Sequence, residues 1–320
     1  MNILVTGGAG FIGSNLCFKL VNEGHKVYCI DNFYSCKKEN ILYLKKYSNF
    51  KFIEHDIIFP LPKKVSETIF DQIYHLACPA SPVIYQKDHI YTLKVNFEGT
   101  LNILNFAKKQ FEKFNVKPKF LFTSTSEVYG DPEVNPQTED YRGNVNPHGI
   151  RSCYDEGKRA AESLCMNFWR KYNLPVKIVR IFNTYGPKMD PQDGRAVSNF
   201  IIQALKGKNL TIYGKGNQTR SFQYIGDLIK GMNLYMGLEE NYSGPVNLGN
   251  PEEISIIDLA KIIIELTNTN VGLDFYDLPK DDPTKRCPDI LLAYNKLGWK
   301  PEVNIKNGLK KTIEYFRSIV

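Results

Sequence analysis

The chain has 320 residues, of which 42% are hydrophobic and 23% charged, and its formal net charge is +7 at pH 7. This length suffices for one large α/β unit plus a smaller domain, and the composition is that of an ordinary globular protein. Because no run of about 18 apolar residues is present, we expect no transmembrane span and no membrane partner. The basic residues are dispersed among acidic ones, which favours attraction of small anionic substrates over nucleic-acid binding.

Seven cysteines are scattered along the chain, with no CxxC pair and no His/Cys cluster. This spacing predicts no metal site and free thiols, which are typical of a reducing cytoplasmic location. The first apolar run begins at Ile3, so we expect no signal peptide.

The chain opens with the pattern of a βαβ unit: a strand at residues 3–5, a helix at 11–22 and a strand at 26–30. Glycines occupy the first turn, in the register Gly7-x-x-Gly10-x-x-Gly13 or Gly8-x-Gly10-x-x-Gly13. Such glycines let the backbone turn tightly and approach a pyrophosphate at the positive N-terminus of the helix. The pattern predicts a dinucleotide-binding unit rather than an ordinary turn.

An acidic residue stands at the end of this βαβ unit. Asp31 follows the second strand, 18 residues after Gly13, and a carboxylate there accepts hydrogen bonds from the adenosine ribose and repels a 2′-phosphate. Asn32 comes next rather than an arginine, so the sequence favours NAD over NADP. Lys37 and Lys38 leave NADP open as an alternative, because a flexible lysine can reach a 2′-phosphate.

The alternation of strands and helices continues through the first half of the chain. Further strands are expected at residues 51–53, 72–76, 119–123 and 176–181, and long helices at 89–113 and 154–172. This order predicts an α/β fold with a Rossmann-type, doubly wound parallel sheet. Ligands of such sheets bind at the C-terminal strand ends, where we expect Gly7, Asp31, Ala77, Thr125 and Asn183 to converge.

The composition changes after Ile181, where turn-forming residues precede shorter elements. Helices are expected at 196–206, 227–238 and 256–266, and strands at 210–213 and 246–248. We expect residues 1–182, with a return segment at about 222–250, to form the NAD-binding domain. Residues 183–221 and 251–320 would form a smaller α/β substrate domain.

Three side chains suggest oxidation chemistry. Tyr154 and Lys158 are four residues apart on one helix face, and Thr125 ends a strand. A phenol is a weak base near neutral pH, but a nearby ammonium and a nicotinamide cation would favour the phenolate. A Tyr/Lys pair alone is common on solvated helix faces. After a nucleotide-binding motif and a strand-end hydroxyl, it indicates a base for a sugar hydroxyl.

The chain resembles the extended short-chain dehydrogenases/reductases that act on nucleotide sugars, and within them the UDP-glucuronate decarboxylase (UDP-xylose synthase) subfamily. The motifs that carry this resemblance span nearly the whole chain in order: TGGAGFIGSNL, VxxIDNF, YHLACPASP, STSEVYGDPEVNPQTEDY, CYDEGKRAAE, RIFNTYGP, DGRAVSNFI, TIYGKGNQTRSFQY, VNLGNPEE and DDPTKRCPDI. One departure is Cys78, where a serine is expected.

The resemblance implies a role for each matching residue. The catalytic group would be Thr125, Ser126, Glu127, Tyr154, Lys158 and Arg286. NAD would be bound by Gly7, Gly10, Phe11, Ile12, Gly13, Asp31, Asn32, Asp56, Ile57, Leu76, Ala77, Tyr154 and Lys158. The UDP-sugar would be bound by Lys94, Asn183, Arg195, Asn199, Tyr213, Arg220 and Arg286. A homodimer would form through a four-helix bundle of helices 89–113 and 154–172.

The resemblance also implies a reaction: oxidation of UDP-glucuronate at C4, loss of carbon dioxide from the 4-keto acid, and return of the hydride to give UDP-xylose. Arg286 would bind the substrate carboxylate, and Glu127 would favour its departure. A UDP-sugar 4-epimerase and a non-catalytic NAD-sensing regulator stay open as alternatives. A 4,6-dehydratase is disfavoured, because Ser126-Glu127 stands where such enzymes commonly carry Asp-Glu.

Overall fold

The computed structural model describes residues 1–239, 242–277 and 286–320. The strands are β1 (Asn2–Thr6), β2 (Lys26–Asp31), β3 (Phe50–Glu54), β4 (Gln72–His75), β5 (Lys119–Thr125), β6 (Val176–Ile181), β7 (Thr184–Tyr185), β8 (Leu210–Tyr213), β9 (Thr219–Ser221), β10 (Gln223–Tyr224), β11 (Pro245–Leu248), β12 (Glu253–Ser255) and β13 (Leu273–Tyr276). The helices are α1 (Phe11–Asn22), α2 (Glu39–Leu42), α3 (Lys63–Ser66), α4 (Pro82–Tyr85), α5 (His89–Lys94), α6 (Thr100–Phe114), α7 (Ser152–Tyr172), α8 (Ala196–Leu205), α9 (Ile225–Gly237), α10 (Ile256–Thr267), α11 (Leu291–Leu297) and α12 (Ile305–Arg317), with shorter turns η1 (Tyr43–Lys46), η2 (Val95–Gly99) and η3 (Ser126–Tyr129).

Seven parallel strands form the main sheet, in the order β11-β6-β5-β4-β1-β2-β3. The chain moves outward from β1 to β3, then crosses over to β4 and continues on the other side. This confirms the predicted Rossmann-type, doubly wound sheet. The crossover makes β1 and β4 neighbours, so their C-terminal ends flank the crevice where ligands of such sheets bind.

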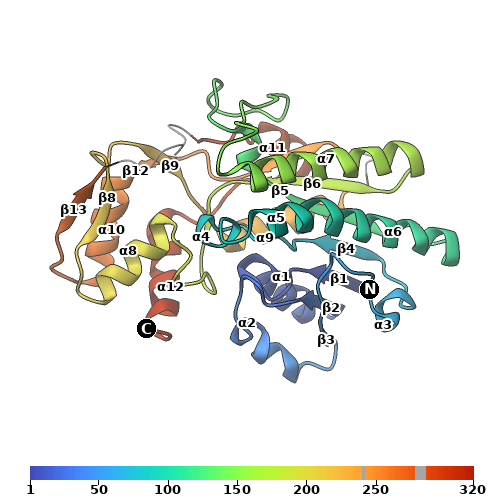
Figure 1. Cartoon of the computed structure of the whole chain (residues 1–320). Coiled ribbons are helices and arrows are strands. Elements are labelled where there is room, and N and C mark those ends of the chain that lie inside the picture. The colour runs from blue at the N-terminus through green and yellow to red at the C-terminus, as the bar shows by residue number, and fades with distance from the viewer. Residues whose placement is uncertain (240–241, 278–285) are drawn as a thin grey trace.

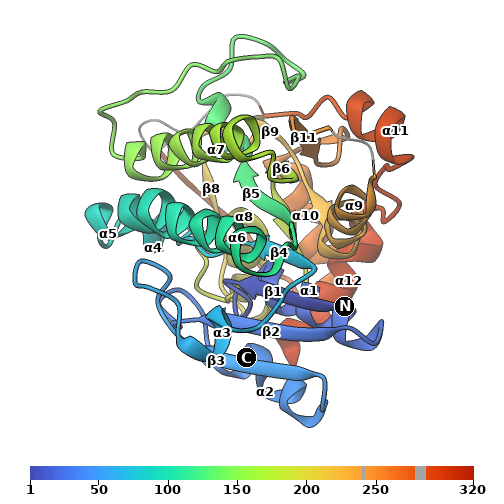
Figure 2. The ribbon, with the colours of Figure 1, turned by 90° about the vertical axis from the view of Figure 1, so that its right-hand side faces the viewer.

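Alternating side chains on the strands bury both faces of this sheet. Ile3 and Val5 pack with α1 and α9 on one face, whereas Leu4 packs with α6 and α7 on the other. Figure 1 shows α6 and α7 running side by side, and Figure 2 shows both helices to the left of β4, β5 and β6, with α9 to the right. Helix α7 is therefore fixed along its length by the core.

A third apolar cluster lies beside the sheet and is built from α8, α10, α12 and β8, at the left of Figure 1. Its buried residues include Phe200, Leu259 and Phe316. Ala293 and Trp299, by contrast, pack in the cluster of the main sheet. The domain limits expected from the sequence stay a prediction, but residues 291–299 contact the main sheet layer rather than this third cluster.

The long helix expected at residues 89–113 is wrong in one respect: it is interrupted. A π-helical turn, η2, separates α5 from α6 and places Asn96 against α7. The extra residue of a π turn shifts the helix face by part of a turn, which apolar spacing alone did not reveal. Helix α12 was not predicted.

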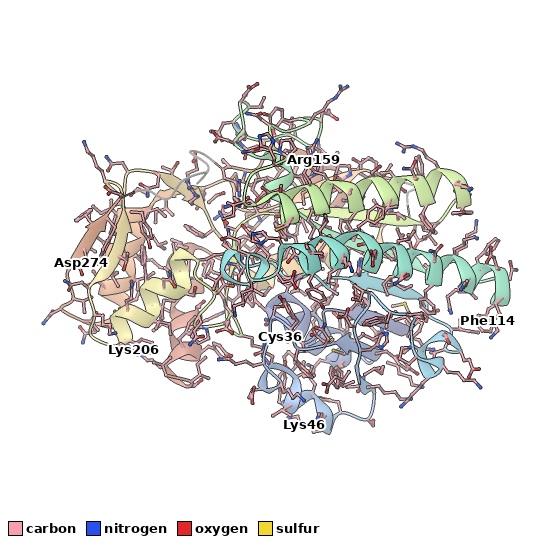
Figure 3. The ribbon with its side chains drawn as sticks, viewed as in Figure 1. Cys36, Lys46, Phe114, Arg159, Lys206 and Asp274 are labelled. Carbon is pink, nitrogen blue, oxygen red and sulfur yellow. The ribbon has the colours of Figure 1, made fainter. Side chains whose placement is uncertain are left out.

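Charged side chains lie at the periphery, as Lys46, Lys206 and Asp274 illustrate in Figure 3. All seven cysteines lie in described segments and are free thiols. Within the described residues, no helix is long and apolar enough to cross a membrane, and no group of three His, Cys, Asp or Glu side chains is arranged to hold a metal ion.

Candidate active site

A cavity of about 670 Å³ lies at the C-terminal ends of β1, β2, β4, β5 and β6, and extends to β8, β9 and α8 beside the third cluster. It is the position expected for the ligand of a doubly wound sheet. Every predicted site residue except Lys94 lines it. Lys94 is exposed at the end of α5 and lies outside the lining, so the predicted substrate role of Lys94 finds no support in this geometry.

The glycine turn is shaped for a backbone-bound ligand. Gly7 has φ +69°, and a Cβ there would lie 2.6 Å from the backbone nitrogen of Ala77. A Cβ on Gly13 would overlap the carbonyl oxygen of Gly7. Gly7, Gly10 and Gly13 line the cavity, whereas a Cβ on Gly8 would face the thiols of the core, which selects the Gly7-x-x-Gly10-x-x-Gly13 register. This open cradle at the start of α1 fits the pyrophosphate of a dinucleotide.

Acidic and amide side chains line the part of the cavity beyond the end of β2. Asp31 accepts hydrogen bonds from the backbone nitrogens of Ala9 (3.0 Å) and Phe33 (2.9 Å), which fix its carboxylate at the strand end. Asn32 donates to Asp56 at 2.9 Å, and the hydroxyl of Tyr91 donates to the same carboxylate at 2.6 Å. Burial raises the pKa of Asp31 from its usual range. These groups fit the adenosine end of NAD, with Ile57, Leu76 and Ala77 as the apolar wall.

Thr125, Tyr154 and Lys158 come together at the end of β5 and the start of α7, and all three are buried. Thr125 is a hydrogen-bond partner of the Tyr154 side chain. The Lys158 ammonium donates to the carbonyl of Thr123 at 2.7 Å and lies 6.0 Å from the Tyr154 ring centroid.

Burial acts on the protonation of both ionisable side chains of this group. Burial raises the pKa of the Tyr154 phenol well above its usual value and lowers the pKa of Lys158. The phenol is therefore protonated in the chain alone, because burial disfavours its charged form. A base at Tyr154 needs the further positive charge of an oxidised nicotinamide.

Glu127, the second residue of η3, lies between two guanidinium groups. Its carboxylate pairs with Arg286 through one oxygen and with Arg151 through the other. Burial raises the pKa of Glu127, but Arg286 and Arg151 outweigh it and the net shift is downward. Ser126 is buried beside them and also lines the cavity. A surface salt bridge of Arg286 with Asp281 or Asp282, which the sequence also allows, falls outside the described residues.

Sequence reasoning missed Arg151. It lies three residues before Tyr154, so the two share a helix face, and this spacing was the available signal. Arg151 also lies 3.8 Å from Asp155, one turn further along α7. Burial, then the nearby Glu127 charge, raises the pKa of Asp155 to about 7.

The Arg286 segment is fixed by two buried amides, which sequence reasoning also missed. The side-chain oxygen of Gln137 accepts a hydrogen bond from the Cys287 backbone nitrogen at 2.9 Å. Asn247 donates to the carbonyls of Gln137 (3.0 Å) and Asp289 (3.1 Å), and it accepts from the hydroxyl of Tyr129 at 2.8 Å. We call Gln137 and Asn247 the amide clamp. It joins the residues that follow Glu127 to those that follow Arg286.

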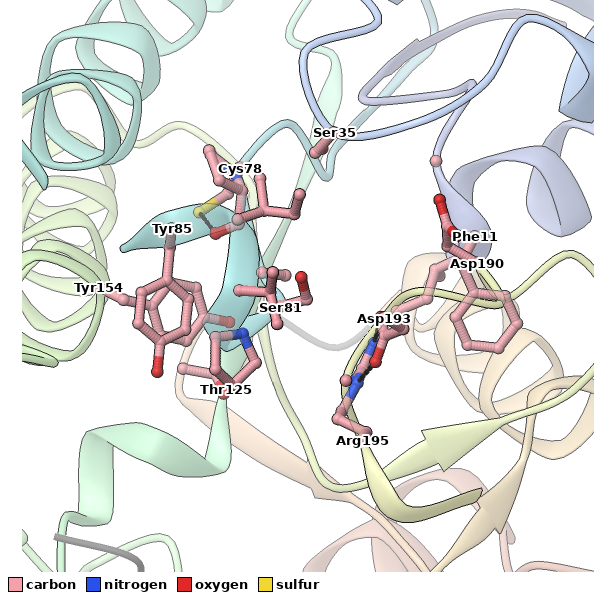
Figure 4. Close-up of a pocket in the computed structure, with 18 of the residues that line it drawn as sticks. Phe11, Ser35, Cys78, Ser81, Tyr85, Thr125, Tyr154, Asp190, Asp193 and Arg195 are labelled. Carbon is pink, nitrogen blue, oxygen red and sulfur yellow. Dashed lines mark hydrogen bonds and ion pairs between the residues drawn. The ribbon is translucent and has the colours of Figure 1, made fainter. Parts of the chain in front are cut away.

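The far side of the cavity carries the predicted UDP-binding group. Arg195 pairs with Asp193 through two hydrogen bonds, on the opposite side of the cavity from Tyr154 in Figure 4. The other members, Asn183, Asn199, Tyr213 and Arg220, also line the wall. Two guanidinium groups and an exposed aromatic ring are suited to a diphosphate and a base.

Comparisons with known proteins agree with this architecture. The GDP-mannose 4,6 dehydratase family model matches residues 4–312. The chain is 50% identical over 315 residues to UDP-glucuronic acid decarboxylase 1 of Xenopus tropicalis, covering 98% of this chain and 72% of the relative. It is 49% identical to UDP-glucuronic acid decarboxylase 6 of Arabidopsis thaliana, covering 99% and 89%.

Solved structures extend the comparison. A Bacillus cereus UDP-glucuronic acid 4-epimerase, in complex with UDP-glucuronic acid and NAD, is 32% identical with a TM-score of 0.88, covering 100% of both chains. A Thermotoga maritima UDP-glucose 4-epimerase with UDP-glucose is 33% identical with a TM-score of 0.88, covering 100% of this chain and 99% of the other.

Proposed function

The chain belongs to the GDP-mannose 4,6 dehydratase family, and within that family we propose that it is an NAD-dependent UDP-glucuronate decarboxylase that forms UDP-xylose. Relatives at about 50% identity over nearly its full length are UDP-glucuronic acid decarboxylases. The single observation that carries the proposal is the Arg151–Glu127–Arg286 cluster, which opens into the same cavity as Tyr154 and Lys158.

Oxidation at C4 of the sugar is the first requirement. When bound, NAD supplies the hydride acceptor for C4 and returns the hydride to the same carbon, so the overall reaction is redox-neutral. Tyr154 takes the proton of the 4-hydroxyl, and Thr125 holds the reacting oxygen by a hydrogen bond. Lys158, held by the Thr123 carbonyl, contributes a positive charge behind the tyrosine. The product of this step is a ketone β to the C5 carboxylate.

Carbon dioxide then leaves with cleavage of the C5–carboxylate bond, and the electron pair enters the enolate of the ketone. Tyr154 and Thr125 stabilise the enolate oxygen by hydrogen bonds. Arg286, which lines the cavity, binds the carboxylate of the substrate. Glu127 opposes the substrate's negative charge, which favours the state in which that charge has left the carboxyl group. C5 takes a proton from water.

The second candidate is a UDP-glucuronate 4-epimerase, because a solved 4-epimerase with this substrate shares the fold. An epimerase needs the same oxidation group but must retain the carboxylate and rotate the ketosugar. The pairing of Glu127 with both arginines favours decarboxylation, since it places an anion beside the bound acid. A non-catalytic NAD-sensing protein would have no use for Thr125, Tyr154 and Lys158 together.

One assay separates these candidates. Purified protein is incubated with UDP-glucuronate labelled at the carboxyl carbon, and labelled carbon dioxide and the product sugar are measured. A decarboxylase releases carbon dioxide in proportion to UDP-xylose. An epimerase gives UDP-galacturonate with the label retained, and a sensing protein gives neither product.

We also propose a homodimer formed by α5, α6 and α7 of each subunit. Ile90, Leu93, Phe97 and Phe111 are 72, 45, 42 and 41% exposed on the α5–α6 face. Phe106 and Phe168, on α6 and α7, are buried within the monomer. Sedimentation at micromolar concentration that shows only a 36.7 kDa species would reject the dimer.

The cytoplasm is the proposed location, because all seven cysteines are free thiols. Cell fractionation tests it. The proposed domain limits are tested by limited proteolysis, which should cut near residues 182 and 251 if each part is an independent unit.

A further inference from the structure

A lysine in the turn after β7 joins two walls of the cavity. Lys188 has a backbone φ of +72°, a left-handed conformation that is uncommon for a residue with a long side chain. Such a conformation persists where surrounding contacts hold it, and it occurs often at functional sites. Lys188 itself is not among the described residues that line the cavity. Its contacts therefore show which parts of the site depend on it.

The ammonium of Lys188 contacts the segment that follows β2. It donates a hydrogen bond to the backbone carbonyl of Asn40, in α2, at 3.0 Å, and it lies 3.3 Å from the ring centroid of Tyr43, in η1. Burial lowers the pKa of Lys188 to about 8, as expected for an ammonium partly withdrawn from water. Lys188 thus fixes the turn after β7 to a segment that lies 148 residues earlier in the chain.

Asn40 in turn contacts the glycine turn. Its side-chain nitrogen donates a hydrogen bond to the carbonyl of Ala9 at 3.0 Å. A second link lies on α1, where the side-chain nitrogen of Asn15 donates to the carbonyl of Pro187 at 3.1 Å. The segment around Lys188 is therefore held against the turn whose shape fits the NAD pyrophosphate.

The residues that follow Lys188 form the wall on the UDP side of the cavity. Met189 is 1% exposed and packs in the third cluster, and Asp190, Asp193 and Arg195 line the cavity. Figure 4 shows these three polar side chains on the same side of the pocket. Arg195, which pairs with Asp193, belongs to the proposed UDP-binding group. Lys188 therefore lies between the NAD side and the UDP side of the site.

We propose that Lys188 is a positioning residue that couples the binding of NAD to the binding of the UDP-sugar. NAD on the glycine turn fixes Ala9 and Asn40, and Lys188 then holds the segment that carries Arg195 where it receives the diphosphate. Coupling is reciprocal, so a bound UDP group also strengthens the retention of NAD. Retention suits a redox-neutral reaction, because the reduced cofactor must stay until the hydride returns. The inference rests on the proposed function.

The test compares the dissociation constant of NAD with and without UDP, which is not consumed. Holoenzyme is dialysed against a series of NAD concentrations, and the NAD that stays bound is measured. In the unmodified protein, saturating UDP should lower this constant by about 5- to 150-fold, the usual range of coupling between two sites. In Lys188→Met, which keeps the apolar stem and removes the ammonium, the ratio of the two constants should fall to near unity. Lys188→Arg, which keeps the charge, should retain most of the effect.

Lys177→Met is the matched control. The ammonium of Lys177, on β6, also donates to a backbone carbonyl, that of Tyr242 at 3.0 Å, and lies 5.2 Å from the ring centroid of Tyr235. Lys177 is 4% exposed and lies outside the lining that the described residues form. Its loss should lower the melting temperature and leave the ratio of NAD dissociation constants unchanged. Destabilisation alone would then not explain the result for Lys188→Met.

Asn40→Ala tests the route of the coupling. It keeps the backbone carbonyl that accepts from Lys188 and removes the link to Ala9. The ratio should fall as in Lys188→Met, and the double variant should show no further loss, because both changes break one chain of contacts. Asn40→Ala also decides the question if Lys188→Met does not fold.

An unchanged ratio in Lys188→Met or in Asn40→Ala would overturn the proposal. An equal weakening of NAD binding with and without UDP would also overturn it, because it would assign Lys188 to the NAD site alone. So would a lack of any UDP effect in the unmodified protein. Carbon dioxide release is measured separately: since UDP is not turned over, a protein that releases none fails the proposed function, while the coupling result still stands.

Discussion

Replacing Glu127 with glutamine should separate decarboxylation from oxidation. The change keeps the side chain's shape but removes the one negative charge between Arg151 and Arg286, whose side chains are only 20 and 6% exposed. Removing one partner of a buried ion pair destabilises a protein by about 3–5 kcal/mol, because the remaining charge stays buried without compensation. Since Arg151 keeps some solvent contact and Asp155 lies 3.8 Å away, we expect a loss near the lower limit, about 3 kcal/mol.

The bound substrate should restore much of this loss. Its carboxylate brings a negative charge to Arg286, so UDP-glucuronate should raise the melting temperature of Glu127→Gln more than that of the unmodified protein. In a single turnover, absorbance of the reduced nicotinamide should appear at a near-normal rate. Carbon dioxide release should slow by about 10²- to 10⁴-fold, the range for losing a group that acts in the transition state.

Glu156→Gln is the matched control. Glu156 lies on α7 and pairs with Arg159 at 3.5 Å on a half-exposed face, outside the cavity lining. It should leave both single-turnover signals unchanged. If the nicotinamide and carbon dioxide signals fall together in Glu127→Gln, Glu127 serves oxidation or folding, and its assigned part in decarboxylation is refuted.

Three further predictions concern α7. Tyr154→Phe should abolish both nicotinamide reduction and carbon dioxide release, by about 10²- to 10⁴-fold; near-normal turnover would show that another group is the base. Gly157→Ala should lower the melting temperature and the turnover number despite a helix-propensity gain of about 1 kcal/mol, because its Cβ would lie 3.0 Å from Asn96; a more stable, fully active variant would contradict this. The pKa of Asp155 is raised from 3.8 to about 7. Its contribution to the free energy of unfolding is therefore fully present below pH 3.8 and is lost as the pH rises to about 7. Asp155→Asn should therefore become more stable than the unmodified protein across this range in urea unfolding, and parallel pH profiles would refute it.

The sequence predicted the parts of this fold that depend on local pattern. The main strands and the helices α1, α7 and α9 follow from apolar periodicity, and most of the predicted boundaries lie within one or two residues of those in the structure. The π turn η2, which places Asn96 close to Gly157 of α7, could not be read this way, because the apolar spacing of residues 89–113 is that of one regular helix.

The same division applies to the site. The glycine turn and the Tyr154–Lys158 pair are local motifs, so their spacing alone suggested their chemistry. Glu127 and Arg286 are 159 residues apart, and only the family resemblance brought them together. The amide clamp had no sequence signal, since the hydrogen bonds of a buried Gln or Asn are defined by tertiary contacts.

The amide clamp has a consequence for transplanting substrate preference between members of this fold. Gln137 holds Cys287 in register, and Asn247, from β11, holds both segments together. The η3 segment and the Arg286 segment are therefore held together as one structural unit. The residue that joins them, Asn247, comes from β11, which is distant from both in the sequence. A 4-epimerase scaffold that receives only one segment should gain no decarboxylation, whereas one that receives both, with the β11 asparagine, carries the complete acid-recognition unit.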